Sequence, residues 1–299
     1  MNRSKIQLGA APIAWTNDDL PELGKENSFE QCISEMALAG YTGSEIGTKY
    51  PNDVKVLKKH LDLRGLTICN AWFSALILEE GEEAAIEAFI KHRDFIYALG
   101  ARVIGSSEQS NSIQGKRDVP IFDGKPVWTD EQWAKVIPVF NRMGDLAEEK
   151  GMKFGIHHHI GTEIETPEEV EKLMELANDN VYLVFDTGHF VFSQGNFEAG
   201  PKILEKYIDR TAHIHLKDIR MDVYNEAKNN KLSFLDAVYN GVFTVPGDGD
   251  FNFKPIFDII ENSNYEGWIV VEAEQDPAKA NAFEYAKKAR EYIRENLKI

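Results

Sequence analysis

The stretch Val181-Tyr182-Leu183-Val184-Phe185-Asp186-Thr187-Gly188-His189 decides the fold of this chain. An apolar, β-rich run of this kind is typical of a buried parallel strand, and here it ends abruptly in a carboxylate, a glycine and an imidazole. Because alternate side chains of a strand share a face, Asp186 points the same way as Val184. A carboxylate beside an imidazole suits a divalent metal or acid–base chemistry. The structural alternative makes Asp186 the N-cap of a following helix and leaves His189 in solvent.

Strand and helix patterns alternate eight times along the chain without a hairpin signal, which predicts parallel βα units. The segment Gly9-Ala10-Ala11-Pro12 lacks the Gly-x-Gly-x-x-Gly pattern of a dinucleotide-binding sheet. We therefore predict an α/β fold, a single (β/α)8 TIM barrel over residues 1–299. The expected strands are 6–13, 41–46, 66–71, 102–106, 153–159, 181–186, 211–217 and 268–274, and the expected helices are 28–39, 52–61, 82–99, 129–149, 167–177, 197–208, 253–262 and 277–297.

The composition narrows the class of protein. Lysine and arginine number 33 and aspartate and glutamate 49, so the net charge is −16, which disfavours nucleic acid and anionic membranes as partners. Cys32 and Cys69 form no Cys-x-x-Cys pair and are expected to be buried and reduced. We find neither a signal peptide nor a run of the roughly 20 apolar residues that span a membrane. These features predict a cytoplasmic protein.

Metal-ligating side chains are predicted at the ends of the last four strands. In a barrel the catalytic residues lie at the C-terminal ends of the strands, so these side chains should meet at one point. A mixed set of imidazoles and carboxylates suits Mn²⁺, Co²⁺, Zn²⁺ or Fe²⁺ better than Ca²⁺. The residues that alternation places on the inner face are His157 and His159, then Asp186, then His213, His215 and Lys217, and finally Glu272 and Glu274.

Three motifs resemble a known family. Asp186-Thr187-Gly188-His189, His215-Leu216-Lys217-Asp218 and Val271-Glu272, in this order and spacing, are similar to the sugar isomerase/epimerase group of xylose-isomerase-like barrels. More narrowly, Gly155-Ile156-His157-His158-His159-Ile160-Gly161-Thr162 and Trp268-Ile269-Val270-Val271-Glu272-Ala273-Glu274-Gln275-Asp276-Pro277 resemble the inosose dehydratases of inositol degradation. The resemblance covers essentially the whole chain, and the last string is the most specific because it extends well beyond the ligands.

The resemblance implies a metal centre. The wider group holds its metal with a glutamate, an aspartate, a histidine and a second glutamate, and the last three correspond here to Asp186, His215 and Glu272. The first glutamate is replaced by His157, with His159 as the alternative ligand. That glutamate is one of two opposed bases in the epimerases, so its absence argues against an epimerase. The dehydratases imply Mn²⁺ or Co²⁺, with Zn²⁺ as a third option, and glutathione as an associated cofactor for which no residue here marks a site.

The resemblance also implies a reaction, the dehydration of 2-keto-myo-inositol (scyllo-inosose) to a trihydroxycyclohexane-dione through an enol. Such chemistry needs a metal to stabilise the enolate, a base for the α proton and an acid for the departing hydroxyl. Glu272 is a candidate base if one of its oxygens stays free. Lys217 is another if a dry, cationic pocket lowers its pKa. The alternative for Lys217 is a structural pairing with Glu272 or Glu274.

The remaining predicted site residues would hold the cyclic polyol ketone. His189 is assigned to the catalytic set and Arg220 to substrate oxygens, while Glu45, Asn70 and Glu108 would bind hydroxyls from the other side. Asn70 and Glu108 are equally well explained as loop caps.

Two long segments, 107–128 and 218–250, follow strands and should emerge on the catalytic face. We predict that they fold over the site, alone or with a neighbouring subunit of a homo-oligomer. Their useful side chains would be Lys116, Arg117, Trp128, Arg220, Tyr224 and Tyr239.

Three other functions compete with a dehydratase. An isomerase or epimerase on the same metal would return the proton instead of losing water. An abasic-site endonuclease needs a multi-metal cluster and a basic groove, which a net charge of −16 disfavours. A non-catalytic sugar-binding relative should have lost ligands, whereas Asp186, His215 and Glu272 are all present.

Overall fold

Nine parallel strand segments form one sheet, in the order β3-β2-β1-β11-β8-β7-β6-β5-β4, in the computed structural model, which describes residues 5–299. The two edge segments, β3 (Thr67–Asn70) and β4 (Trp72–Ala75), are consecutive in the chain and are separated only by Ala71. The sheet therefore closes on itself, with β3 and β4 together as the third strand of an eight-position barrel. The predicted (β/α)8 TIM barrel is confirmed.

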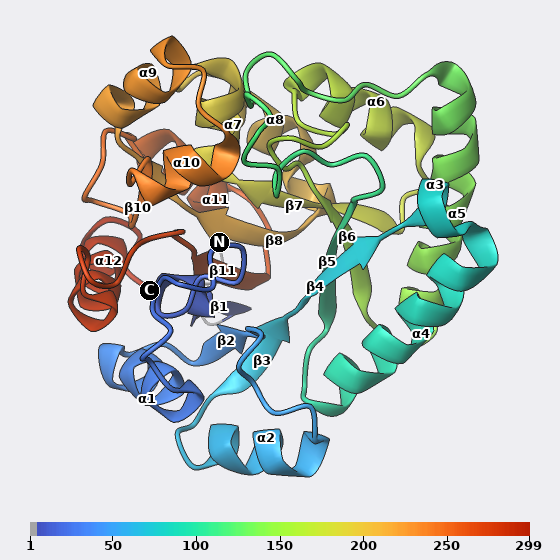
Figure 1. Cartoon of the computed structure of the whole chain (residues 1–299). Coiled ribbons are helices and arrows are strands. Elements are labelled where there is room, and N and C mark those ends of the chain that lie inside the picture. Colours follow the sequence, from blue (N-terminus) through green and yellow to red (C-terminus); the bar gives the residue numbers. More distant parts are fainter. Residues whose placement is uncertain (1–4) are drawn as a thin grey trace.

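The helices form a ring outside the barrel (Figure 1). The other barrel strands are β1 (Ile6–Ala10), β2 (Gly43–Glu45), β5 (Val103–Glu108), β6 (Lys153–His157), β7 (Val181–Asp186), β8 (Thr211–Leu216) and β11 (Gly267–Val271). The helices are α1 (Phe29–Ala39), α2 (Val54–Asp62), α3 (Ile77–Glu80), α4 (Glu82–Ala98), α5 (Asp130–Glu148), α6 (Pro167–Leu176), α7 (Thr187–Gln194), α8 (Ala199–Tyr207), α9 (Met221–Asn229), α10 (Phe234–Tyr239), α11 (Lys254–Asn262) and α12 (Ala282–Asn296).

Local sequence signals explain where the helices begin and end. The Ser28 side chain accepts a hydrogen bond from the Gln31 amide at the start of α1, and Gly40 ends that helix with a φ of 93°, a conformation that favours glycine. Thr129 and Gln132 form the predicted capping box of α5.

The register of the strands brings the predicted ligands to one rim. Asp186 is the direct partner of His215, and His215 lies level with Val270, two residues before Glu272. His157 lies level with Val184, two residues before Asp186. Strands β6, β8 and β11 end earlier than predicted, so each ligand candidate lies within its strand's last two residues or directly after it.

The structure also differs from the prediction in three places that surround the site. The first strand ends at Ala10 instead of residue 13, because Pro12 begins a 3-10 turn over Pro12–Ala14. Helix α7, which the sequence offered only as the structural alternative with Asp186 as its N-cap, begins directly after β7. The segment 218–250 contains α9, α10 and a short antiparallel ribbon of β9 (Asp218–Ile219) and β10 (Phe243–Thr244), although the sequence indicated only 234–239.

Candidate metal centre and catalytic cavity

Four side chains from β6, β7, β8 and the end of β11 converge on one point. His215 Nδ1 lies 3.3 Å from His157 Nε2, 3.6 Å from Asp186 Oδ2 and 2.8 Å from Glu272 Oε2. His157 Nε2 lies 3.7 Å from Asp186 Oδ2. Four ligands placed tetrahedrally about 2.1 Å from a divalent ion lie about 3.4 Å from one another. The His157, Asp186 and His215 atoms therefore have the spacing of a metal site, and Glu272 Oε2 adjoins it through His215.

The two oxygens of Asp186 have different roles. Oδ1 accepts the His189 amide hydrogen and caps α7, as the structural alternative predicted. Oδ2 is buried and has no hydrogen-bond partner. Burial raises the pKa of Asp186, but Lys217 together with His189, His157 and His215 outweighs it and holds that pKa well below its usual range. A buried carboxylate oxygen without a hydrogen bond is costly, and its nearest cation, Lys217 Nζ, lies 3.5 Å away, so a bound metal ion would satisfy it better. The residues present thus fit a divalent metal.

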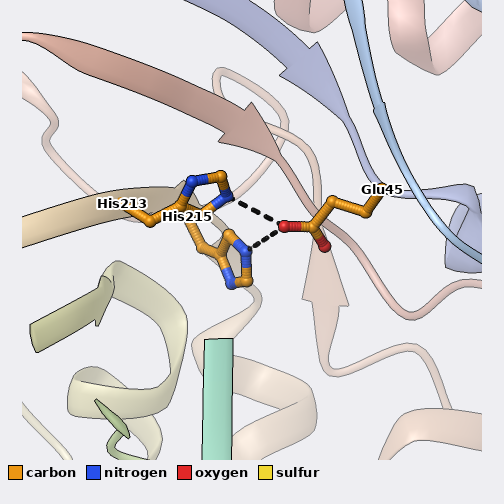
Figure 2. A group of neighbouring side chains, drawn as sticks. All are labelled: Glu45, His213 and His215. Atoms are coloured by element: carbon orange, nitrogen blue, oxygen red, sulfur yellow. Dashed lines mark hydrogen bonds and ion pairs between the residues drawn. The ribbon is translucent and has the colours of Figure 1, made fainter. Parts of the chain in front are cut away.

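Glu45 orients one of these ligands, His215, through the ring nitrogen Nε2. Its Oε1 accepts hydrogen bonds from His213 Nε2 and His215 Nε2, each at 2.9 Å (Figure 2). Burial lowers the pKa of His215, but the Glu272 and Glu45 carboxylates outweigh it and raise that pKa well above its ordinary value, so a bound metal would take the place of the Nδ1 proton that faces Glu272 Oε2. A carboxylate behind a metal-binding imidazole fixes its tautomer and orientation in the same way in known metal sites.

Lys217 is fully buried among carboxylates. Its Nζ lies 2.8 Å from Glu272 Oε1, 2.8 Å from Glu274 Oε2 and 3.5 Å from Asp186 Oδ2. Burial alone would lower the pKa of Lys217, but these carboxylates outweigh it and raise that pKa above its ordinary value. The expected cationic pocket and lowered pKa are therefore wrong, because the surroundings are anionic. The structure agrees with the alternative, a lysine paired with Glu272 and Glu274.

A cavity of about 570 Å³ opens over these ligands. That volume lies within the range of small-molecule sites. Its wall includes both predicted alternatives for the first ligand, because His157 and His159 share a face while His158 packs against the Phe190 ring at 3.7 Å. The other wall residues that matter here are Asp18, Asp19, Glu45, Asn70, Trp72, Gln114, His215, Glu272 and Glu274.

Comparison with known proteins agrees with this geometry. Residues 33–296 match a family described as xylose isomerase-like TIM barrel. The inosose dehydratase of Glaesserella parasuis serovar 5 is 60% identical over 295 residues, 99% of both chains, and that of Clostridium perfringens strain ATCC 13124 is 57% identical over 300 residues, 100% of both. The chain belongs to the inosose dehydratase family. The family resemblance carried by the motifs is thereby confirmed.

Solved structures show the same fold at lower identity. The IOLI protein with a bound zinc atom has a TM-score of 0.72 at 16% identity, covering 97% of this chain and 98% of that one. The probable 3-DHS dehydratase AsbF of Bacillus anthracis has a TM-score of 0.71 at 15% identity, covering 96% and 98%. At these identities the likeness shows the fold shared by the inosose dehydratase family and these proteins.

Besides the buried Asp186 and Lys217, three predicted site residues lie outside the cavity wall of this family member. Glu108 accepts hydrogen bonds from the Leu78 amide and from Ser110, so it is a loop cap. Arg220 donates to the Gly241 and Phe243 carbonyls, to Thr244 and to Asp248. His189 accepts the Ile160 amide hydrogen on Nδ1, and its Nε2 lies 3.0 Å from Lys217 Nζ. The structure therefore gives these three supporting contacts in place of substrate contacts.

Glu45 and Asn70 do line the cavity, but their polar atoms are partly committed. Asn70 Nδ2 donates to Glu45 Oε1 at 2.9 Å, and Asn70 Oδ1 accepts the Gly105 amide hydrogen. The sequence analysis did not assign Trp72, Gln114 or Asp19 to the site. Strand alternation alone signalled Glu274, which shares the face of Glu272. No sequence signal marked Trp72, Gln114 or Asp19.

The two long segments pack against each other beside the cavity. The Ile121 amide donates to the Leu232 carbonyl at 3.0 Å, and Arg117 forms an ion pair with Asp236 at 2.8 Å. Gln114 is the residue of 107–128 in the cavity wall, and none of the six side chains expected to cover a substrate lines it. Covering of the site by these segments stays a prediction.

Two further expectations concern the environment of the chain. Cys32 and Cys69 are both buried free thiols, as predicted. Among residues 5–299, none of the helices combines the length and the apolar composition that a membrane span requires.

Proposed function

We propose that this chain is a hydro-lyase that removes water from 2-keto-myo-inositol with the help of one divalent metal. The observation that carries the proposal is the convergence of His157, Asp186, His215 and Glu272 around the unpartnered Asp186 Oδ2, beneath a cavity large enough for a six-membered ring. Bound there, the metal would supply a Lewis acid that polarises the ketone oxygen. The names of the family members support the substrate.

We assign the removal of the α proton to His159. Its Nδ1 donates to the Ile160 carbonyl at 2.8 Å, so the tautomer leaves the Nε2 lone pair free, and the residue lines the cavity. The predicted bases are less well placed. Glu272 uses Oε1 for Lys217 and directs Oε2 toward His215 Nδ1, and Lys217 itself lies outside the cavity wall. His159→Asn tests the assignment, since its amide retains a donor near Nδ1 and removes Nε2.

Trp72 in the wall and Lys217 behind it have supporting roles: Trp72 would contact the substrate ring, and Lys217 holds carboxylates in place. The Trp72 indole lies edge-to-face with the His157 and His159 rings, each at 5.7 Å, and leaves 37% of the residue exposed toward the cavity. Its apolar face can cover the C–H face of a polyol ring. Lys217 keeps Glu272 and Glu274 in place from behind the wall.

The test is direct. Purified protein with Mn²⁺ is incubated with 2-keto-myo-inositol, and the product mass is followed in D₂O. Loss of water supports the dehydratase. Unchanged mass apart from deuterium uptake would instead support an isomerase or epimerase, which the histidine in place of a glutamate at position 157 argues against. If the protein catalyses neither reaction, the proposal is overturned.

The family resemblance also supports proposals for the metal, an added cofactor, the cellular location and the assembly. We propose Mn²⁺ or Co²⁺ as the metal, with Zn²⁺, which the IOLI protein binds, as a third ion to test. Glutathione belongs in the assay as a separate variable, because the resemblance implies it. We further propose a cytoplasmic enzyme, a homo-oligomer, that acts on a small cyclic polyol ketone without nucleic acid or membrane partners.

A further inference from the structure

Asp19 differs from the other acidic residues of the cavity wall because its carboxylate is uncommitted. Within residues 5–299 that carboxylate makes no hydrogen bond and no ion pair. The neighbouring Asp18 accepts hydrogen bonds from the Thr48 amide and from its hydroxyl, at 3.3 and 2.6 Å. Glu45, Glu272 and Glu274 are held by histidines or by Lys217. Asp19 is thus the acid with a free functional group in this wall.

The backbone beneath Asp19 is fixed although its side chain is free. Asn17 Oδ1 accepts the amide hydrogens of Asp19 and Leu20, at 3.0 and 2.9 Å, and the Asn17 amide donates to the Leu23 carbonyl. This turn lies in the connection between β1 and α1 and holds Asp19 in the wall of the cavity. A side chain presented in this way can meet a substrate without rearrangement of the loop.

The charges around Asp19 favour its protonated form. The Asp19 side chain is exposed at the cavity, where partial desolvation and the adjacent Asp18 carboxylate raise its pKa, Lys217 opposes the shift, and Glu272 adds to it. A carboxylic acid with a raised pKa keeps its proton to a higher pH and can transfer that proton to a poor leaving group.

We propose that Asp19 is the general acid that protonates the departing β-hydroxyl, an assignment that rests on the proposed dehydratase function. As the C–O bond breaks, its electron pair leaves with the hydroxyl oxygen, which takes the Asp19 proton and departs as water. The electron pair of the former α C–H bond forms the new C=C bond. Asp19 is left as a carboxylate and regains a proton from solvent.

The experiment separates the two halves of the reaction. Asp19→Asn and the parent, both loaded with Mn²⁺, are given 2-keto-myo-inositol in D₂O, and two rates are followed: α-deuterium incorporation and loss of water. We expect water loss to fall by roughly 10²- to 10³-fold in kcat with little change in KM, while α-deuterium incorporation stays within a few-fold of the parent. The pH profile of water loss should also lose the limb that reports the acid.

Asp18→Asn is the matched control, since it removes the neighbouring charge from the same loop. Because the Asp18 carboxylate raises the pKa of Asp19, this variant should move the acid limb of the water-loss profile to lower pH without abolishing it, while α-deuterium incorporation stays close to that of the parent. The assignment is overturned if Asp19→Asn keeps its rate of water loss, or if both its rates fall together, as loss of a binding contact would cause. A parent that shows neither rate would sink the dehydratase proposal itself, and the Asp19 assignment with it.

Discussion

The two halves of the barrel carry similar polar residues at their strand ends but use them differently. In the half formed by β6, β7, β8 and β11, ligand atoms of His157, Asp186 and His215 face one another, and Asp186 Oδ2 has no hydrogen-bond partner. In the half formed by β2, β3 and β5, the oxygens of Asn70 and Glu108 already accept internal hydrogen bonds.

The difference shows that a polar residue at a strand end becomes a site only when its polar atoms lack partners inside the protein. Glu45 links the two halves. It belongs to β2, yet its carboxylate reaches across the barrel to His213 and His215 of β8. Substitutions at matched positions in the two halves should therefore have effects of very different size.

The largest effect should come from Asp186→Asn. The amide oxygen can still cap α7, but an NH₂ group replaces the unpartnered Oδ2 and cannot bind a cation. We expect the folded variant to lose its bound metal and to lose at least about 10³-fold in activity, because the metal supplies the Lewis acid. Metal analysis beside circular dichroism checks this. A folded variant with full metal content would show that Asp186 is not a ligand.

Lys217→Met should have the next largest effect, which is a fall in the free energy of unfolding. The change leaves the carboxylates of Asp186, Glu272 and Glu274 without their buried counter-charge. Removal of one partner of a buried ion pair costs about 3–5 kcal/mol, so the free energy of unfolding should fall by that order. Urea denaturation of the metal-free proteins measures it. A loss below about 1 kcal/mol would contradict the pairing and reopen a catalytic role for Lys217.

Glu45→Gln tests the link between the halves. Loss of the carboxylate behind His215 should weaken the binding of Mn²⁺ by roughly 10- to 100-fold, which calorimetric titration measures. Glu108→Gln is the matched control in the other half, because Glu108 caps a loop outside the cavity wall. Its metal affinity should stay that of the parent. Equal weakening in both variants would remove the distinction between the halves.

The smallest effect concerns Glu165, a half-buried carboxylate outside the cavity wall. Burial raises the pKa of Glu165 to about 7, although the Gly161 amide donates to it. The folded protein thus holds this proton more tightly than the unfolded chain, so the contribution of Glu165 to stability is lost as the pH rises from about 4.5 to about 7. Glu165→Gln should therefore gain about 1–2 kcal/mol relative to the parent across this range and then level off. Denaturation at several pH values measures the difference in unfolding free energy between the variant and the parent. A difference that stays constant with pH would contradict the raised pKa of Glu165.

The sequence predicts most of the fold and the core of the site. Strict alternation of strands and helices leads to the barrel, and period-two alternation places His157 and His159 on the cavity side and His158 outside it. Asp186, His215 and Glu272 could be selected because they recur at successive strand ends.

The partners of these residues could not be predicted, because they come from distant parts of the chain. Glu45 meets His215 across 170 residues, and Lys217 meets Glu272 across 55. The same limit explains the errors for Arg220 and for the pKa of Lys217, since in both cases the sequence shows the charge but not its counter-charge. Asp19 could not be found because Asp18 and Asp19 both line the cavity, and only the hydrogen bonds that Asp18 accepts from Thr48 distinguish them.

The most direct test of the metal centre is a crystal structure of the protein grown with Mn²⁺, with anomalous scattering used to locate the ion. The account predicts one strong peak about 2.0–2.3 Å from His157 Nε2, Asp186 Oδ2, His215 Nδ1 and a Glu272 oxygen. Three other groups of potential ligands lie close by: one, Asp186 with His189 and Glu272, shares Asp186, and two do not, Glu45 with His213 and His215, and His159 with His189 and Glu274. A peak at either of those groups, with none at Asp186 Oδ2, would contradict it.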